Sequence, residues 1–220
     1  MDSGPKTSQT DDLIKVLAAA QGRQPRGRPW PAVSASLAAG LTVTVLLTAA
    51  TLGIRPDLAA SLTNPVAWLK LGFSVFVLFA AGMAAWRLSL PGKGWSGAGL
   101  VLLVVFGVVA CWALVDLAGR PMVEWAPCIT GRDWLTCLVA VPLLALPPML
   151  AMGLAMRRLA PTRLDLAGTL LGLASGGGAA FAFTLFCQDD TASFVAVWYG
   201  LALGVSALLG RVLGSRLLRW

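Results

Sequence analysis

The chain has 220 residues, of which 57% are hydrophobic and 12% are charged, and its formal net charge is +7. The charged share is about half that of ordinary soluble domains, and the apolar residues come in long blocks, which excludes a water-soluble globular fold. The basic residues flank apolar runs, which indicates the cytoplasmic lipid surface rather than nucleic acid as their partner. The sequence contains no His, so the commonest metal ligand and the commonest general base are both missing.

The first predicted element is a short amphipathic helix in the run TDDLIKVLAA, from Thr10 to Ala19. Thr10 is the expected N-cap, and the two acidic residues behind it favour the positive end of the helix dipole. A helix of about three turns is marginal on its own in water. Its apolar face therefore predicts docking on a protein partner, and a tail without function is the alternative. The residues of this expected binding segment are Asp11, Asp12, Leu13, Ile14 and Leu17.

A basic, proline-rich tether follows, RQPRGRPWP, and six apolar runs occupy the rest of the chain. Each run has about the 20 residues that a membrane-spanning helix needs, and the first is too long for a signal peptide. We therefore expect an all-α polytopic membrane protein with a cytoplasmic segment at 1–32 and a six-helix transmembrane domain at 33–220. The expected spans are Val33–Gly53, Val66–Trp86, Trp95–Leu117, Leu135–Met156, Leu166–Phe186 and Ser193–Leu213.

The distribution of basic residues predicts the orientation of these spans. Thirteen of the 17 Lys and Arg residues lie in the tail, in the loops after the second and fourth spans and at the C-terminus. Three lie on the other face, and Lys70 falls inside a span. Because basic loops stay in the cytoplasm, both termini are expected there.

Proline and glycine patterns predict the shapes of the last three spans. Prolines remove backbone donors, so the fourth span should be bent. Small residues four apart let membrane helices approach closely, so the fifth and sixth spans should pack tightly. The prolines are Pro142, Pro147 and Pro148, and the glycines are Gly168, Gly172 and Gly176 with the pairs Gly200 and Gly204, and Gly210 and Gly214.

Two of the four cysteines fall at the outer ends of neighbouring spans. Cys137 is the third residue of the fourth span and Cys187 follows the fifth, so a sensor or a disulfide is the favoured interpretation. The alternative is that each thiol fills apolar space at a helix end. Cys128 and Cys111 are not favoured as sensors. No C-x-x-C pair is present, which argues against a thiol oxidoreductase.

The turn after the fifth span also offers donors for a soft metal ion. Cys187, Asp189 and Asp190, with Cys137 opposite, form the sulfur and oxygen donor set expected for a thiophilic ion. Without His, a closed zinc site is not expected, and neither is a resident cofactor.

Lys70 and Asp116 are the charged residues nearest the membrane interior. An ionisable residue within a span is a candidate for a transport pathway, so a small transporter or transporter subunit is the alternative function. Both residues fall near the outer ends of their spans, where Lys can extend to the interface and the two can pair. The sequence holds no phosphate-binding loop, nucleophile elbow or catalytic triad, so an enzyme is not expected.

With these pieces in place, the chain resembles the NrsF-type negative regulators of extracytoplasmic-function sigma factors over nearly its whole length. The family loop often reads H-C-x-E/D-D, and here Phe186 stands in place of the His, whereas Asp189 and Asp190 remain. This departure weakens any His-assisted metal site. The stretches that carry the resemblance are TDDLIKVLAA, GIRPDLAASL, PVAWLKLGF, LTCLVAVPLLALPP, RRLAPTRLDLAG and FCQDDTASFVAVWYGLA, in this order.

The resemblance implies a six-helix anti-sigma factor of the bacterial inner membrane. Its N-terminal segment is then expected to hold an extracytoplasmic-function sigma factor away from RNA polymerase, without contacting nucleic acid directly. Its periplasm-side cysteines, matching Cys137 and Cys187, are expected to sense heavy-metal or oxidative stress. A heavy-metal ion would act as a transient signal rather than a cofactor, and the lipid bilayer is the other expected partner.

Overall fold

In the computed structural model, the described residues are 10–16, 19, 30–89, 97–157, 159 and 163–217. The chain divides into two compact units, Met1–Pro31 and Ala32–Trp220. In the first unit, residues 10–16 are helical, and Thr10 is itself helical rather than the cap that the sequence suggested. The side chains of Leu13 and Ile14 are each 58% exposed, so the helix presents apolar surface to its surroundings. Leu17 lies outside the described residues.

The second unit is an all-helical bundle in the part that the structure describes. Among these residues, six stretches are long and apolar enough to cross a membrane, which confirms the all-α class and the six predicted spans. Trp95, the expected start of the third span, lies outside the described residues. The long helices are α2 (Trp30–Thr51), α4 (Pro65–Leu88), α5 (Ala98–Ala118), α7 (Trp134–Leu144) followed by α8 (Leu146–Arg157), α9 (Leu164–Thr184), and α11 (Gly200–Leu217). The shorter elements are α3 (Leu58–Ser61), η1 (Met122–Glu124), α6 (Trp125–Thr130), α10 (Ala192–Phe194) and the π-helical turn η2 (Val195–Tyr199).

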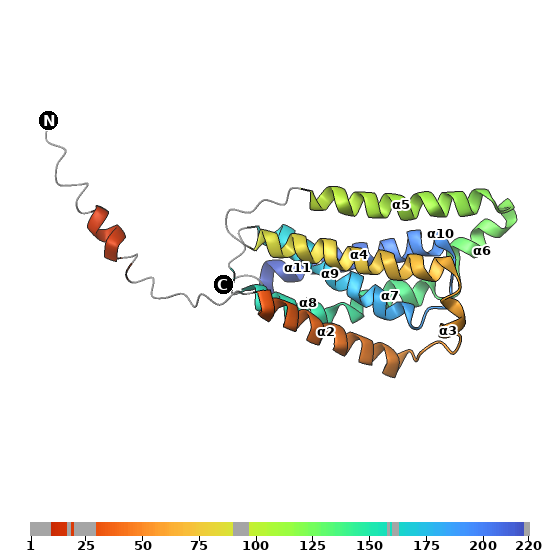
Figure 1. Ribbon diagram of the computed structural model, residues 1–220, viewed down its shortest axis with the longest axis horizontal. Coiled ribbons are helices and arrows are strands. Elements are labelled where there is room, and N and C mark those ends of the chain that lie inside the picture. The colour runs from red at the N-terminus through yellow and green to blue at the C-terminus, as the bar shows by residue number, and fades with distance from the viewer. Residues whose placement is uncertain are drawn as a thin grey trace, which may run out of the picture. The chain divides into compact units, whose positions relative to one another are not determined.

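Helix α9 forms the centre of the bundle, with α4 and α11 packed beside it (Figure 1). Its glycines allow these close approaches. A Cβ on Gly172 would lie 2.8 Å from the Gly210 Cα, and one on Gly177 would lie 2.7 Å from the Leu78 backbone nitrogen of α4. The predicted tight packing of the fifth and sixth spans is therefore confirmed at Gly210 and Gly214. It does not extend to Gly204, where a Cβ would meet nothing within 4 Å.

The fourth span is interrupted at Ala145, between α7 and α8, as its prolines predicted. Pro148 has no N–H to donate to the carbonyl oxygen of Leu144 one turn earlier. Thr44 of α2 compensates, because its hydroxyl lies 2.9 Å from that oxygen and 3.0 Å from the Gly40 carbonyl oxygen of its own helix. Gly40 lies directly against the Pro148 backbone, where a Cβ would collide. The break is thus also a contact point for α2.

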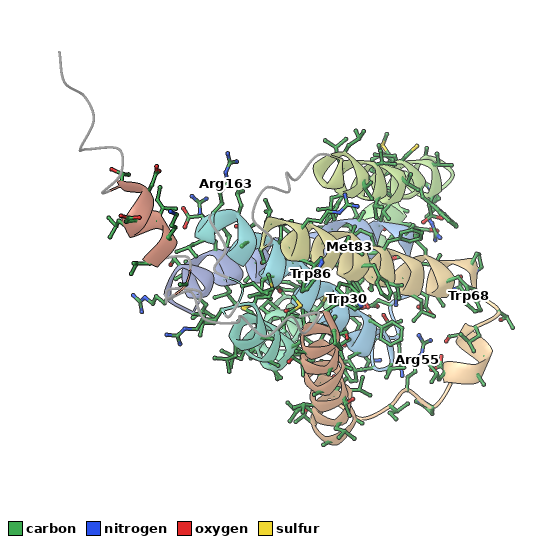
Figure 2. The ribbon with its side chains drawn as sticks, turned by 60° about the vertical axis from the view of Figure 1, so that its left-hand side comes forward. Trp30, Arg55, Trp68, Met83, Trp86 and Arg163 are labelled. Atoms are coloured by element: carbon green, nitrogen blue, oxygen red, sulfur yellow. The ribbon has the colours of Figure 1, made fainter. Side chains whose placement is uncertain are left out.

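The two ends of the bundle differ in charge. One end, which we call the α3 end, holds α3, α6 and the turn between α9 and α10 (Figure 1). Figure 2 shows Arg55 and Trp68 at this end and Arg163 at the opposite one. At the α3 end, basic side chains face acidic ones, whereas Asp165 is the single acidic residue that the structure describes near the opposite end. The basic residues described there are Arg87, Arg157, Arg163, Arg211 and Arg216.

Candidate functional site

The candidate site is the turn that joins α9 to α10, which holds Cys187, Asp189 and Asp190. The connection after α2 is fastened to this turn through its backbone. Helix α2 ends at Thr51, and Gly53 two residues later has a φ of 85°, the left-handed conformation that suits the residue after a helix C-terminus. Two residues later, the Arg55 N–H donates to the Leu185 carbonyl oxygen at 3.0 Å.

The Arg55 side chain joins the same connection to the turn. Its guanidinium is 3% exposed and donates to both carboxylate oxygens of Asp57, at 2.9 Å each. It also donates to Asp190 Oδ2 and to the Cys187 carbonyl oxygen, each at 3.0 Å. These contacts with Asp57 first, and with Asp190, raise the pKa of Arg55 and keep its charge fixed. The expected donor residue Asp190 is therefore held in ion pairs.

Lys70 of α4 is the second cation bound to Asp190. Its side chain is fully buried, and Nζ lies 2.8 Å from Asp190 Oδ1. Nζ also lies 3.4 Å from the Cys187 carbonyl oxygen and 3.6 Å from Cys187 Sγ. Burial alone would raise the pKa of Asp190, but hydrogen bonds from Arg55 and Lys70 outweigh it, so the pKa is lowered.

The expected pairing of Lys70 with Asp116 is wrong. Asp116 pairs with Arg120, which lies four residues later, just after the end of α5, at 3.2 Å. Lys70 does not extend to the surface either, because Asp190 supplies a carboxylate next to its buried ammonium. A buried charge is tolerated where such a partner is in hydrogen-bond contact.

Asp189 attaches the turn to the start of α7. Its Oδ2 accepts hydrogen bonds from the backbone N–H groups of Arg132, at 2.9 Å, and Asp133, at 2.7 Å. Gly131 precedes them with a φ of 59°, and a Cβ there would lie 2.8 Å from the same carboxylate oxygen. A negative charge at the N-terminus of a helix is favourable. Asp189 therefore links the turn to the helix that carries Cys137.

Both favoured cysteines are fully buried, and they belong to the same apolar core cluster as Tyr199. All four thiols are free. Burial raises the pKa of the Cys187 thiol, and the neighbouring Lys70 ammonium opposes that rise. Cys128 is half-buried in α6 and Cys111 is exposed on α5. The structure thus places Cys137 and Cys187 in one core cluster, whereas Cys128 contacts the neighbouring turn through its carbonyl oxygen, which accepts from Thr191 and Ser193.

The sulfur and carboxylate donors that lie together differ from the set expected from sequence. Donor atoms of Asp133, Cys187 and Asp189 lie within 4.8 Å of one another. Cys137 is not part of this group, and Asp190 is engaged by Arg55 and Lys70. Asp133 was missed, although its place just before the fourth span was a usable signal. Sulfur with carboxylate oxygen is a donor set suited to a soft or borderline divalent ion.

Comparisons with known proteins show which family this sequence resembles. Residues 17–220 match the family model described as NrsF, negative regulator of sigma F. The chain is 38% identical over 220 residues to the anti-sigma-F factor NrsF of Caulobacter vibrioides, an alignment that covers 96% of this chain and 100% of that protein. It is 34% identical over 214 residues to the probable anti-sigma-F factor NrsF of Azospira oryzae, with the same coverage. No solved structure matches.

Proposed function

The chain belongs to the NrsF family of negative regulators of sigma F, and on that premise we propose that it sequesters an extracytoplasmic-function sigma factor and releases it when Cys187 and Cys137 react. The observation that carries the proposal is the contact set of the turn holding Cys187. This turn bonds to the connection after α2 through Arg55, to α4 through Lys70 and to the residue before α7 through Asp189. A change at that sulfur therefore acts on three other helices.

The sigma-binding element in this proposal is the segment 11–20, with Asp11, Asp12, Leu13, Ile14 and Leu17 as its contact residues. The described part of this segment is helical and exposes Leu13 and Ile14. A short amphipathic helix gains stability by laying its apolar face into a partner's groove. This arrangement supports a protein partner, and the proposal includes no direct contact of the segment with nucleic acid.

The proposed orientation places both termini in the cytoplasm of a bacterium and the α3 end in the periplasm, with the bundle in the inner membrane. The basic residues at the end opposite α3 support it. In this orientation the sigma factor and the two sulfurs occupy opposite sides of the membrane. The signal must therefore travel through the helices.

The proposed stimulus is an oxidant or a thiophilic metal ion that reaches the turn from the periplasm. A metal ion would act transiently, held by Cys187, Asp189 and Asp133, with Cys137 close by in the same core. Asp190 contributes to the site through its ion pair with Lys70. That ion pair changes when the turn moves. No step of this mechanism is catalytic, because the protein acts by binding and releasing a partner.

Substitution of the apolar face of the first helix tests the binding half of the proposal. We expect the sigma factor not to co-purify with the double variant Leu13→Asp, Leu17→Asp from solubilised membranes. Burying two unpaired carboxylates in an apolar groove costs too much free energy. Lys15→Ala is the matched control, since the Lys15 side chain is 79% exposed on the same helix. Undiminished capture of the sigma factor by the double variant would refute the proposed binding role of this segment.

Substitution of the sulfurs tests the sensing half. A hundredfold release requires the signal to favour the open state by about 2.7 kcal/mol, which one disulfide or one metal–thiolate bond supplies. We expect Cys187→Ser and Cys137→Ser each to retain the sigma factor after cells are exposed to cadmium chloride or hydrogen peroxide, whereas Cys111→Ser releases it normally. Normal release by both buried-site variants would rule out cysteine sensing.

The transporter alternative depended on Lys70 and Asp116, and both are held in ion pairs at the α3 end. Deletion of residues 1–22 separates the two functions. An anti-sigma factor loses repression in this deletion, whereas a transporter keeps its flux.

A further inference from the structure

We propose that α2 is the output helix of the sensor, and that Arg55 and Thr44 are the residues that couple it to the two cysteine-bearing segments. This inference rests on the proposed sensing function. It answers how a change at the α3 end reaches the N-terminal segment. Among the six spans, α2 is the first to follow that segment and its tether in the sequence, so it is the span to which the segment is joined.

Helix α2 is held along a narrow stripe. Of its 22 residues, only Val33, Gly40, Thr44 and Thr48 are buried. The last three of these are spaced four apart, so they lie on one face of the helix. Five residues beside this stripe are half-buried, of which Leu37 and Leu41 pack against the core, and the remaining residues of the helix are exposed. The polar contacts on this stripe and at its end therefore have a large share in fixing its position.

The first coupling contact connects the chain just after α2, at Arg55, to the segment of Cys187. The Arg55 guanidinium donates to the Cys187 carbonyl oxygen and to Asp190, and its backbone N–H donates to Leu185. The Cys187 sulfur is fully buried, so any group added to it must displace its surroundings or its own backbone. Displacing that backbone moves the oxygen to which Arg55 is bonded.

The second coupling contact connects the middle of α2 to the helix of Cys137. The Thr44 hydroxyl serves the Leu144 carbonyl oxygen that Pro148 leaves without a backbone donor. Leu144 is the last residue of α7, and Cys137 lies on that same helix two turns earlier. A shift of α7 therefore changes the hydrogen bond at Thr44. Each of the two cysteine-bearing segments thus has a polar contact to α2 or to the connection that follows it.

Oxidation by hydrogen peroxide illustrates how both contacts are engaged together. One thiol takes up an oxygen atom to become a sulfenic acid, and the peroxide is reduced to water. The second thiol then displaces hydroxide from that sulfur, which forms a disulfide and a second water. Drawing the two sulfurs together pulls on the α9–α10 turn and on α7 at once, and so on both attachments of α2.

The test measures the dissociation constant of the co-purifying sigma factor on purified full-length chain in lipid nanodiscs, without oxidant. We expect Thr44→Val to raise it about threefold to tenfold, as the loss of one hydrogen bond allows, and Arg55→Met to raise it at least tenfold. Thr42→Val is the control on α2, because Thr42 is exposed and bonds only within its own helix. Arg120→Met is the control at the α3 end, because Arg120 pairs with Asp116 of α5. Thr44→Ser keeps the hydroxyl and should bind like the wild type.

A second measurement tests whether the coupling contacts act after the sulfurs, which a general loosening of the fold would not mimic. In a Cys137→Ser, Cys187→Ser background, Arg55→Met and Thr44→Val should each raise the dissociation constant by the same factor as they do when both cysteines are present. The reason is that the coupling contacts act after the sulfurs. Equal constants for Thr44→Val and Thr42→Val would overturn the inference, even if Arg55→Met failed to accumulate. If sulfur substitution abolishes stress release while both coupling variants bind normally, the inference fails and the sensing function stands.

Discussion

Replacement of Gly172 by Val is expected to destabilise the bundle by about 3 kcal/mol or more, the upper range for overpacking a well-packed core. A Cβ at this position would lie 2.8 Å from the Gly210 Cα and 3.0 Å from the Gly210 backbone nitrogen of α11. Backbone atoms cannot rotate away as a flexible side chain can. The two helices must separate, and association in a membrane depends on this close packing.

The control for this prediction lies on the facing helix. Gly204 of α11 is exposed, and a Cβ there would meet nothing within 4 Å. We therefore expect Gly204→Val to change the free energy of unfolding by about 0.5 kcal/mol or less. Unfolding of both variants in mixed micelles with increasing dodecyl sulfate gives the comparison. Similar unfolding curves for Gly172→Val and Gly204→Val would contradict the packing that places α9 at the centre.

The features of the fold that could be predicted from sequence are those with a local cause. The six spans follow from the length of uninterrupted apolar runs, and the break at Ala145 follows from the missing N–H of Pro148. Close packing at Gly172 follows from small residues at a spacing of four. The same spacing at Gly204 predicted a contact that is absent, because the pattern does not tell which face of α11 meets α9.

The ion pairs of the candidate site could not be predicted in the same way, because their partners are distant in the sequence. Lys70 and Asp190 are 120 residues apart, and Arg55 and Asp190 are 135 apart. Sequence placed Lys70 at the edge of a span but gave no means of choosing Asp190 over Asp116 as its partner. One signal was available for Arg55: it is among only three arginines on a face whose loops are otherwise acidic or neutral.

The group of metal-donor residues at the turn could be predicted only in part, because some of its members are neighbours in sequence and one is not. Cys187 and Asp189 are neighbours in sequence, so their shared location required no knowledge of the fold. Asp133 joins them because Asp189 accepts the hydrogen bond of its backbone N–H, a contact across 56 residues. The orientation of Asp190 toward Arg55 and Lys70 likewise depends on where α2 ends and where α4 begins in space.

Removal of the Asp190 carboxylate is expected to have an effect as large as that of Gly172→Val. In Asp190→Ala, the fully buried Lys70 ammonium loses its anionic partner, and breaking a buried pair from one side costs about 3–5 kcal/mol. Asp57→Ala is the matched control, because Asp57 also contacts Arg55 but its side chain is 51% exposed. Without Asp57, the Arg55 guanidinium still pairs with Asp190, so Asp57→Ala should cost clearly less free energy of unfolding than Asp190→Ala.

A second substitution identifies the cause of the Asp190→Ala defect. If an unpaired buried cation is responsible, the double variant Lys70→Met, Asp190→Ala should recover most of the lost free energy of unfolding, because Met fills similar space without charge. If the carboxylate instead stabilised the turn only through Arg55, removing Lys70 as well would give no recovery. Equal losses in Asp190→Ala and Asp57→Ala would show that burial does not separate the two carboxylates. The three variants therefore decide whether Asp190 joins α4 to the cysteine-bearing turn, which is the contact that the proposed sensor needs.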